Sequence, residues 1–525
     1  PMGKIDHVVV LMLENRSFNC LMGYLYDDQN KPKHFVTSPD TKNPVFNGVA
    51  DKELYNFDNN GNKINVHKAP YETQLDMTFP NPDPGEEYDH VMTQMNKGKN
   101  ADGKKMMGFV QDYIDAMQTA DGWMEEKNPT IEEYSRILGC YPPEATPVLS
   151  GLARDFAVSD EWHCSVPSQT FCNRSFFHSA SSHGFVTNSD YVKWINNDQK
   201  TIYNLLSENN IDWRVYWDIQ DVFGSLTRLI HPPLYSKRYD SNFRSYGHDY
   251  RAEEDPAQDR FRKDCAVGDL PAYTFIEPRL FFNHNDMHPP VFSNTMIDSS
   301  ILAGEELVNK VYEDLFIHGK KKDSTLLIIT FDEHGGCYDH VYPPKTVPPV
   351  KNPTYPLQEN FQFDQMGVRV PTLMISPWIK KGTVFRSTEP GKALEHTSVI
   401  KTVCDWQKKL NGKHLTDRDL YSPDFAAVLN AKEKRSEMPI YIAREYVPAP
   451  EPHAGLSLKA KFQRLLISWI VGLIMRIPPE DAAEVGCILR FIISVVKWFL
   501  RLIFPKKMSY LSNLQKGILD FILKS

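Results

Sequence analysis

The feature that most constrains this chain is a set of short, unbroken apolar runs that end abruptly in acidic or amide residues. The clearest are HVVVLMLEN at 7–15 and STLLIITFDEH at 324–334. Runs of this length without polar alternation are typical of parallel strands that are buried on both faces. We therefore expect both runs to lie inside a sheet that helices cover on either side.

Strand patterns alternate with helical patterns along the rest of the chain. We expect a helix and then a short strand within 152–164, further strands at 212–217, 272–278 and 368–378, and helices at 173–183, 297–315 and 396–410. This alternation predicts an α/β fold with a mainly parallel sheet sandwiched by helices. Ligands bind beyond the carboxyl ends of the strands in such sheets, so the residues that follow each strand are candidates for a functional site.

The residues at these strand ends are rich in side chains that can bind metals. Glu14 and the pair Asp332-Glu333 each follow an apolar run, and Asp286 and His288 lie in a loop after another. A single carboxylate in such a place is more often a helix cap or a turn residue. Two adjacent buried carboxylates, however, raise each other's pKa unless a cation lies between them. The combination therefore favours a divalent metal site of the kind used for hydrolysis.

Five segments, spread over about residues 4–410 in matching order, resemble a known family. They are ENRSFN at 14–19, PSQTFCNRSFFHSASSHG at 167–184, NDMHPP at 285–290, FDEHGGCYDHVYPP at 331–344 and EHTSVIKTV at 395–403. They resemble the bacterial phosphoesterase family of haemolytic and non-haemolytic phospholipases C, plant non-specific phospholipases C and AcpA-type acid phosphatases. Asn19 departs from the Asp that is usual there. The resemblance implies an alkaline-phosphatase-like fold.

The resemblance also implies roles for particular residues. The implied ligands of a first metal are Glu14, Asn15, Thr170, Asp332 and Glu333, with Thr170 as the nucleophile. Asp286, His288 and His396 would form a second cluster, which is either a second metal site or leaving-group machinery. Asn173 and Arg174 would bind phosphoryl oxygens, with Glu277 as a less certain substrate-binding member.

The motif FDEHGGCYDH contains three further ionisable residues. His334 is expected to take a catalytic acid/base or supporting part, as are Asp339 and His340, although a purely structural role fits all three as well.

The chemistry of these residue types agrees with that reading. A threonine hydroxyl bound to a divalent cation loses its proton near neutral pH, as metal-bound water does. The planar donor fork of Arg174 suits a phosphate. We expect one or two divalent ions, with Zn²⁺ first, although carboxylate-rich ligation with histidine also fits Mn²⁺, Fe or Ca²⁺. Thr170 is selected by its alignment to the Asn-Arg pair, since spacing alone does not distinguish it from nearby serines.

The net charge of −8 is unevenly distributed. Residues 456–525 carry eleven Lys and Arg against four acids, so the rest of the chain is markedly acidic. An acidic body argues against nucleic acid as a partner. We divide the chain into a catalytic region at 1–446 with insertions at about 27–105 and 185–265, a Pro-rich linker at 447–455 and the basic tail at 456–525.

The tail combines dense apolar residues with regularly spaced basic ones. Its longest uncharged run, 465–475, is well short of the roughly 20 residues that a spanning helix needs. This pattern is typical of amphipathic helices that lie in a membrane interface, with Trp469 and Trp498 as contacts. A helical hairpin packed on the body or on a second copy of the chain is the alternative, as is a tail that packs in solution and opens on a bilayer.

The leading functional hypothesis is a phospholipase C. It would hydrolyse phosphatidylcholine, and other glycerophospholipids, to diacylglycerol and a phosphorylated head group. The alternatives are an acid phosphatase with the same chemistry and a non-catalytic membrane-binding protein. No signal peptide is evident in PMGKIDHVVVLMLEN. We therefore expect a protein that is exported by another route or peripheral to the membrane. The resemblance to the phosphoesterase family further implies a bacterial protein with host membranes as targets and a role in virulence.

Overall fold

The computed structural model describes residues 2–447, apart from short gaps. The gaps are 99–100, 120–127, 189–193, 195–196, 220, 222–223, 248–258, 281–283 and 291–298. Almost all of the predicted linker and the whole tail, including Trp469 and Trp498, lie outside the described residues. Among the described helices, none is long and apolar enough to cross a membrane.

The centre of the protein is a nine-stranded sheet in the order β10-β9-β11-β1-β12-β13-β7-β14-β2. Its strands are β1 His7–Leu13, β2 His34–Val36, β7 Ala157–Ser159, β9 Trp213–Asp218, β10 Phe243–Tyr246, β11 Tyr273–Glu277, β12 Thr325–Phe331, β13 Thr372–Ile375 and β14 Thr383–Phe385. β1 runs parallel to both neighbours, with Val10 opposite Phe275 of β11 and Ile328 of β12. The two apolar runs that we singled out are thus adjacent buried strands, and the predicted mixed α/β fold with a mostly parallel sheet is confirmed.

β13 is the exception to the parallel arrangement, since it runs antiparallel to β12 and to β7. It is also shorter than the strand that we predicted at 368–378. Pro371 and Pro377 flank it, and a proline has no backbone N–H to donate to a sheet. The prolines therefore confine regular pairing to the four residues Thr372–Ile375.

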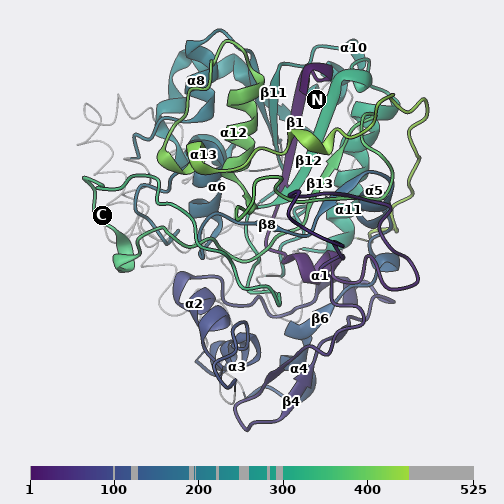
Figure 1. The fold of residues 1–525 in the computed structure, drawn as a ribbon, viewed down its shortest axis with the longest axis vertical. Coiled ribbons are helices and arrows are strands. Elements are labelled where there is room, and N and C mark those ends of the chain that lie inside the picture. The colour runs from purple at the N-terminus through teal and green to yellow at the C-terminus, as the bar shows by residue number, and fades with distance from the viewer. Residues whose placement is uncertain are drawn as a thin grey trace, which may run out of the picture.

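Helices lie on both sides of the sheet. They are α1 Phe18–Met22, α2 Tyr88–Asn96, α3 Phe109–Thr119, α4 Ile131–Ser135, α5 Pro147–Asp155, α6 Thr170–Ser179, α8 Ile202–Glu208, α9 Leu226–Ile230, α10 Arg260–Val267, α11 Ile301–Tyr312, α12 Thr397–Trp406 and α13 Asp417–Tyr421. α6 packs with α12 on one side, and α5 packs with α11 on the other (Figure 1). The helix expected at 297–315 begins at Ile301 in the structure, after the cap residue Ser300, and continues beyond Tyr312 as a π-helical turn, Glu313–Ile317.

The two predicted insertions contribute to this architecture in different ways. The range 27–105 supplies the edge strand β2, the hairpin of β3 Tyr55–Phe57 and β4 Lys63–Asn65, and helix α2. α2, α3 and α4 gather at the lower end of the view in Figure 1, toward which the carboxyl ends of β1 and β12 point. The range 185–265 supplies β9 and β10, so it adds one side of the main sheet.

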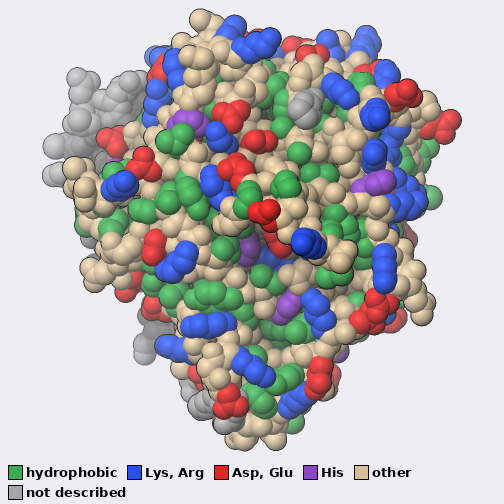
Figure 2. Space-filling view, in the orientation of Figure 1, with side chains coloured by type: hydrophobic (Ala, Val, Ile, Leu, Met, Phe, Trp, Pro, Cys, Tyr) green, Lys and Arg blue, Asp and Glu red, His purple; other side chains and the backbone are tan. Residues whose placement is uncertain are grey.

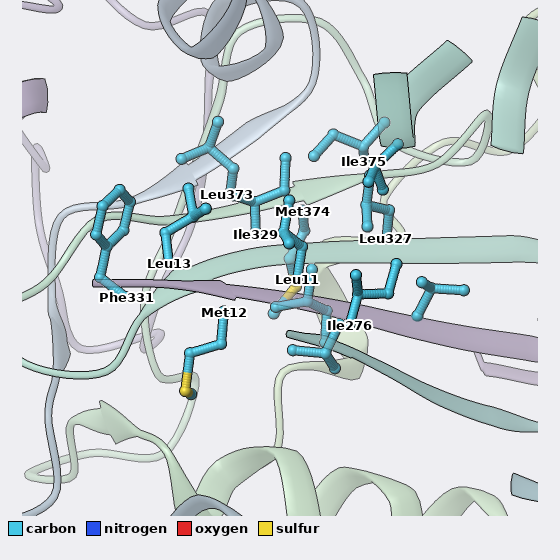
Figure 3. Close-up of a cluster of buried hydrophobic side chains, with 14 of the residues drawn as sticks. Leu11, Met12, Leu13, Ile276, Leu327, Ile329, Phe331, Leu373, Met374 and Ile375 are labelled. Carbon is cyan, nitrogen blue, oxygen red and sulfur yellow. The ribbon is translucent and has the colours of Figure 1, made fainter. Parts of the chain in front are cut away.

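The core is built from side chains of the central strands. Figure 3 shows Leu13 and Met12 on opposite faces of β1, with Leu373 and Ile329 packed on the Leu13 side. All seven residues of β1 and all seven of β12 are buried. Burial of both faces explains why these sequences show no polar alternation. On the outer face shown in Figure 2, acidic and basic side chains are interspersed.

A smaller pair of strands, β8 Trp162–His163 and β15 Leu394–Glu395, lies next to the carboxyl edge. His163 is buried, and its Nδ1 donates a hydrogen bond to the carbonyl of Gly367 over 3.0 Å. Burial lowers the pKa of His163 to about 4, so the folded protein keeps this imidazole neutral.

We expect the free energy of unfolding of the His163→Gln variant to depend less steeply on pH, in the acidic range, than that of the wild type. The unfolded chain binds a proton at His163 below about pH 6.5, whereas the folded protein resists protonation down to about pH 4. The contribution of neutral His163 to the free energy of unfolding is therefore complete above pH 6.5. It falls by about 1.4 kcal/mol per pH unit as the pH drops from about 6.5 to about 4. Urea unfolding at several pH values measures the slope. An unchanged slope in the variant would contradict this account.

Candidate active site

The carboxylates at the ends of the two central strands lie against one buried arginine. Arg174 of α6 donates from Nε to Asp332 Oδ2 over 3.2 Å and from Nη2 to Glu14 Oε1 over 3.1 Å. Glu14 follows β1 and Asp332 follows β12, and all three residues are almost fully buried. The parallel pairing of the two strands therefore brings together the acidic residues that the sequence predicted at one edge.

The backbone around Asp332 and Glu333 holds both carboxylates in place. Asp332 Oδ1 accepts from the N–H of Glu333 over 2.8 Å, and Glu333 Oε2 accepts from the N–H of Gly335 over 2.6 Å. Gly335 has φ +60°, and a Cβ there would lie 2.4 Å from the carbonyl oxygen of Asn15. Only glycine fits this close approach, so the segment after β12 can fold tightly over the segment after β1.

The site concentrates negative charge away from water. Burial raises the pKa of Glu14 well above its usual range, and the neighbouring Asp332 carboxylate raises it further. Burial and Asp332 have the same effect on Glu333, whose Oε1 has no hydrogen-bond partner among the described residues. A divalent cation would relieve both effects, and carboxylate oxygens are suitable ligands for it.

Thr170 is the first residue of α6 and lies one turn before Arg174. Residues four apart in a helix share a face, so Thr170 lies on the side that carries Arg174 and its two carboxylates. No hydrogen bond engages the Thr170 hydroxyl within the part of the chain that the structure describes. Thr170 is 7% exposed, the most accessible of the residues that we predicted as ligands of the first metal. This placement suits a nucleophile.

The side chain of Asn173, which the resemblance implied as a phosphate-binding group, is bonded to backbone groups of the preceding loop. Its Oδ1 accepts from the N–H of Val166, and its Nδ2 donates to the carbonyls of Val166 and Ser168. The side chain thus fastens the loop that leads into Thr170. Asn173 positions the loop, and its amide is already used within the protein.

Glu277 also serves the backbone in this structure. Its carboxylate accepts from the N–H groups of Leu226 and Thr227, at the beginning of α9. This is the capping role that a strand-end carboxylate most often has.

Asp286, His288 and His396, which were predicted to form a second cluster, contact different groups in the structure. His396 contacts the carbonyl of Asp332 through Nε2 over 2.6 Å, and its Nδ1 faces the indole N–H of Trp162 over 3.4 Å. Asp286 binds the His284 ring over 2.8 Å and the N–H of His288 over 2.8 Å. Across the described residues, no hydrogen bond or ion pair joins His396 to Asp286 or His288.

His334, Asp339 and His340 are all tied to protein groups. His334 Nε2 lies 2.7 Å from Gln94 Oε1, Asp339 pairs with Arg369, and His340 Nδ1 lies 2.8 Å from Asn19 Nδ2. Burial lowers the pKa of His334 to about 3, so it stays neutral in the folded protein. These contacts indicate supporting rather than substrate-binding positions.

Asp83, Glu86 and Gln94 were not predicted from the sequence. Asp83 and Glu86 lie with the predicted His288 in a cluster, in which the potential metal-ligating atoms are all within 4.8 Å of one another. Gln94 of α2 supports His334. The segment DPGEEYDH at 83–90 is dense in acidic residues, but no apolar strand precedes it. A search for polar residues directly after apolar strands therefore does not identify this segment.

Comparisons with known proteins show which family the sequence matches. The sequence model of the Phosphoesterase family matches residues 5–407. Non-specific phospholipase C6 of Arabidopsis thaliana is 33% identical over 480 residues, which cover 88% of this chain and 79% of the relative. Non-specific phospholipase C1 of the same plant is 33% identical, covering 87% and 75%. The non-hemolytic phospholipase C of Pseudomonas aeruginosa is 22% identical, covering 86% and 62%. The relatives therefore do not favour a bacterial over a plant source.

Distant likenesses to solved structures also exist. A Vibrio parahaemolyticus protein of the alkaline phosphatase superfamily has a TM-score of 0.30 at 14% identity, covering 53% of this chain and 64% of that one. The lipoteichoic acid synthase LtaP of Listeria monocytogenes has a TM-score of 0.30 at 14% identity, covering 54% and 69%.

Proposed function

This chain belongs to the phosphoesterase family, and from that premise we propose that it is a phospholipase C. It hydrolyses phosphatidylcholine and related glycerophospholipids to diacylglycerol and a phosphorylated head group. The observation that carries the proposal is the grouping of Thr170, Arg174, Glu14 and Asp332 at the carboxyl edge of the sheet. The naming of its relatives as phospholipases C supports the choice of substrate class. An alkaline-phosphatase-like arrangement of the sheet is part of the same proposal.

A first divalent cation, with Zn²⁺ expected, would be held by Glu14, Asp332 and Glu333 together with Thr170, and Asn15 lies next to them. The fit rests on the buried carboxylates and on Glu333 Oε1, which is buried and has no hydrogen-bond partner in the described part of the chain. When bound, the ion would lower the pKa of the threonine hydroxyl and offset the charge of a phosphate.

The chain's own residues then define the reaction. Thr170 Oγ1 gives up its proton and attacks phosphorus, and the bond to the diacylglycerol oxygen breaks. That oxygen takes up a proton, and the phosphorylated head group stays bound to Thr170 as a phosphodiester. Water hydrolyses this ester and releases the phosphorylated head group. Arg174 keeps Glu14 and Asp332 in position and provides positive charge beside the phosphate. His288, or a second cation when bound, would stabilise the leaving oxygen.

The tail, which lies outside the described residues, would bring the enzyme to its substrate. Residues 456–525 are proposed to bind the bilayer interface, with Trp469 and Trp498 as contacts. If the tail instead packs on the body or on a second copy of the chain, deleting the tail would leave the binding of the protein to vesicles unchanged.

The proposal is tested by comparing substrates. We expect the full chain to release phosphocholine from phosphatidylcholine vesicles faster than it hydrolyses p-nitrophenyl phosphate. Deleting 456–525 should reduce the vesicle rate by about tenfold or more, because interfacial binding is lost, and should not alter the rate on a dissolved short-chain phosphatidylcholine. A higher rate on p-nitrophenyl phosphate would favour an acid phosphatase, and an unchanged vesicle rate after deletion would exclude the membrane role of the tail.

A further inference from the structure

We infer that Asp83, Glu86 and His288 form a second divalent-cation site, which lies against Asn15 beside the proposed first one. The inference rests on the proposed function and deepens it, because it assigns the second cation to residues other than the predicted Asp286 and His396. It also brings a segment into the active site that the sequence did not connect with chemistry.

The ligand atoms are close together and shielded from water. The three candidate atoms lie within 4.8 Å of one another, and His288 Nε2 is 3.8 Å from Glu86 Oε2. Glu86 is 5% exposed and His288 is 8% exposed. Two carboxylates and an imidazole are a donor set that Zn²⁺ and Mn²⁺ accept.

The hydrogen bond on the far side of His288 sets the tautomer that a metal needs. Its Nδ1 lies 2.6 Å from the carbonyl oxygen of Pro289, which can only accept. Nδ1 therefore carries the proton, and the lone pair of Nε2 faces Glu86 and Asn15. Histidine ligands of metals are commonly fixed by such a bond from the other ring nitrogen to a backbone carbonyl.

Asn15 provides the independent observation that points to a ligand. Its Nδ2 lies 2.7 Å from His288 Nε2 and also donates to Glu86 Oε2, so the positive end of this amide lies between two acceptors. Asn15 is fully buried, and its Oδ1 has no hydrogen-bond partner among the residues that the structure describes. A half-turn of the amide exchanges the two atoms and brings Oδ1 toward the acceptors, where a cation would bind it as a fourth ligand.

The position of Glu86 relates this cluster to the reaction. Its Oε1 accepts from Nε2 of Gln169, the residue directly before Thr170, over 3.4 Å. A cation bound by Glu86 would therefore lie near the nucleophile. In sites with two ions, the second ion stabilises the oxygen that leaves as the nucleophile attacks. His396 is unsuited to this part, because its Nε2 faces the carbonyl of Asp332 and its Nδ1 faces the indole N–H of Trp162. Asp286 contacts His284 and the backbone of His288 instead.

Metal content of the full chain tests the inference. The protein is stripped with a chelator, reloaded with Zn²⁺ and assayed for bound zinc by mass spectrometry during a titration. We expect the wild type to bind two ions, and Glu86→Gln to weaken one of them by about 10- to 100-fold or more while the other is retained. Asp83→Asn, at a side chain that is 11% exposed, provides a second variant that removes only a charge. Glu87→Gln is the matched control, since it removes a neighbouring carboxylate outside the cluster and should bind two ions.

The outcomes separate this inference from the proposed function. If Glu86→Gln and Asp83→Asn bind as much zinc as the wild type, the second site is overturned. Asp332→Asn decides the first site in the same titration, because it should lose the ion that the Glu86 variant retains. If Asp332→Asn keeps both ions, the metal chemistry of the proposed function fails, whatever the Glu86 variant shows.

Discussion

The Thr170→Ala variant should lose hydrolysis of phosphatidylcholine by about 10⁴-fold or more, because removal of a covalent nucleophile leaves only binding and electrostatic assistance. Its fold should be intact, since the Thr170 hydroxyl makes no hydrogen bond within the described residues and alanine is a good helix former. Release of phosphocholine from vesicles measures the effect. Rapid quenching of the wild type in acid should in addition trap phosphocholine on Thr170, and the variant should show none.

Ser168→Ala is the matched control for this result. Ser168 lies two residues earlier in the same loop, and its hydroxyl donates to the carbonyl of Val186 over 2.6 Å. Loss of that bond should lower stability by about 1 kcal/mol and leave most of the activity. An active Thr170→Ala enzyme, or an inactive Ser168→Ala enzyme that is folded, would transfer the nucleophile to another hydroxyl.

The Arg369→Met variant should lose about 3–5 kcal/mol of unfolding free energy, because it leaves the buried Asp339 carboxylate without its ion-pair partner. Arg369 is fully buried and donates to both Asp339 oxygens, over 3.0 and 3.2 Å. It also donates to the carbonyl of Asp160 over 2.6 Å and to Oδ1 of Asn19 over 3.0 Å. Urea unfolding followed by circular dichroism gives the change directly.

Lys345→Met is the control for the loss of a cation as such. Lys345 pairs with Asp364 over 3.1 Å, but both side chains are well exposed. An exposed pair contributes about 0–1 kcal/mol. If the two variants unfold at the same urea concentration, the Arg369 network does not stabilise the fold in the way that its geometry indicates.

The strand-end residues could be predicted because their positions follow from local patterns. The apolar runs before Glu14 and Asp332 identify two buried strands, and parallel neighbours have their carboxyl ends at one edge. Arg174 and Thr170 were identified by resemblance, and the helix that begins at Thr170 explains why they share a face.

The remaining differences arise from contacts between distant segments. Glu86 comes from a segment without strand or helix signals before it, and only its packing against Asn15 shows its importance. The amide of Asn173 and the carboxylate of Glu277 are engaged by backbone groups that no sequence pattern reveals. Which hydrogen bonds a polar side chain makes is decided by tertiary structure, so residue type alone predicts a candidate and not its role.

The pairing of β1 also bears on how the protein is made. The N–H of Asn15 reaches a carboxylate oxygen of Asp332, a residue 317 positions later in the chain, and β1 lies between two strands that are synthesised long after it. During translation the apolar segment of β1 therefore has neither of its partner strands until β11 and β12 have left the ribosome. A nascent chain that ends before Asp332 cannot assemble the Glu14–Arg174–Asp332 grouping, so it would carry no hydrolytic activity. The same delay makes the exposed first strand a natural binding segment for chaperones.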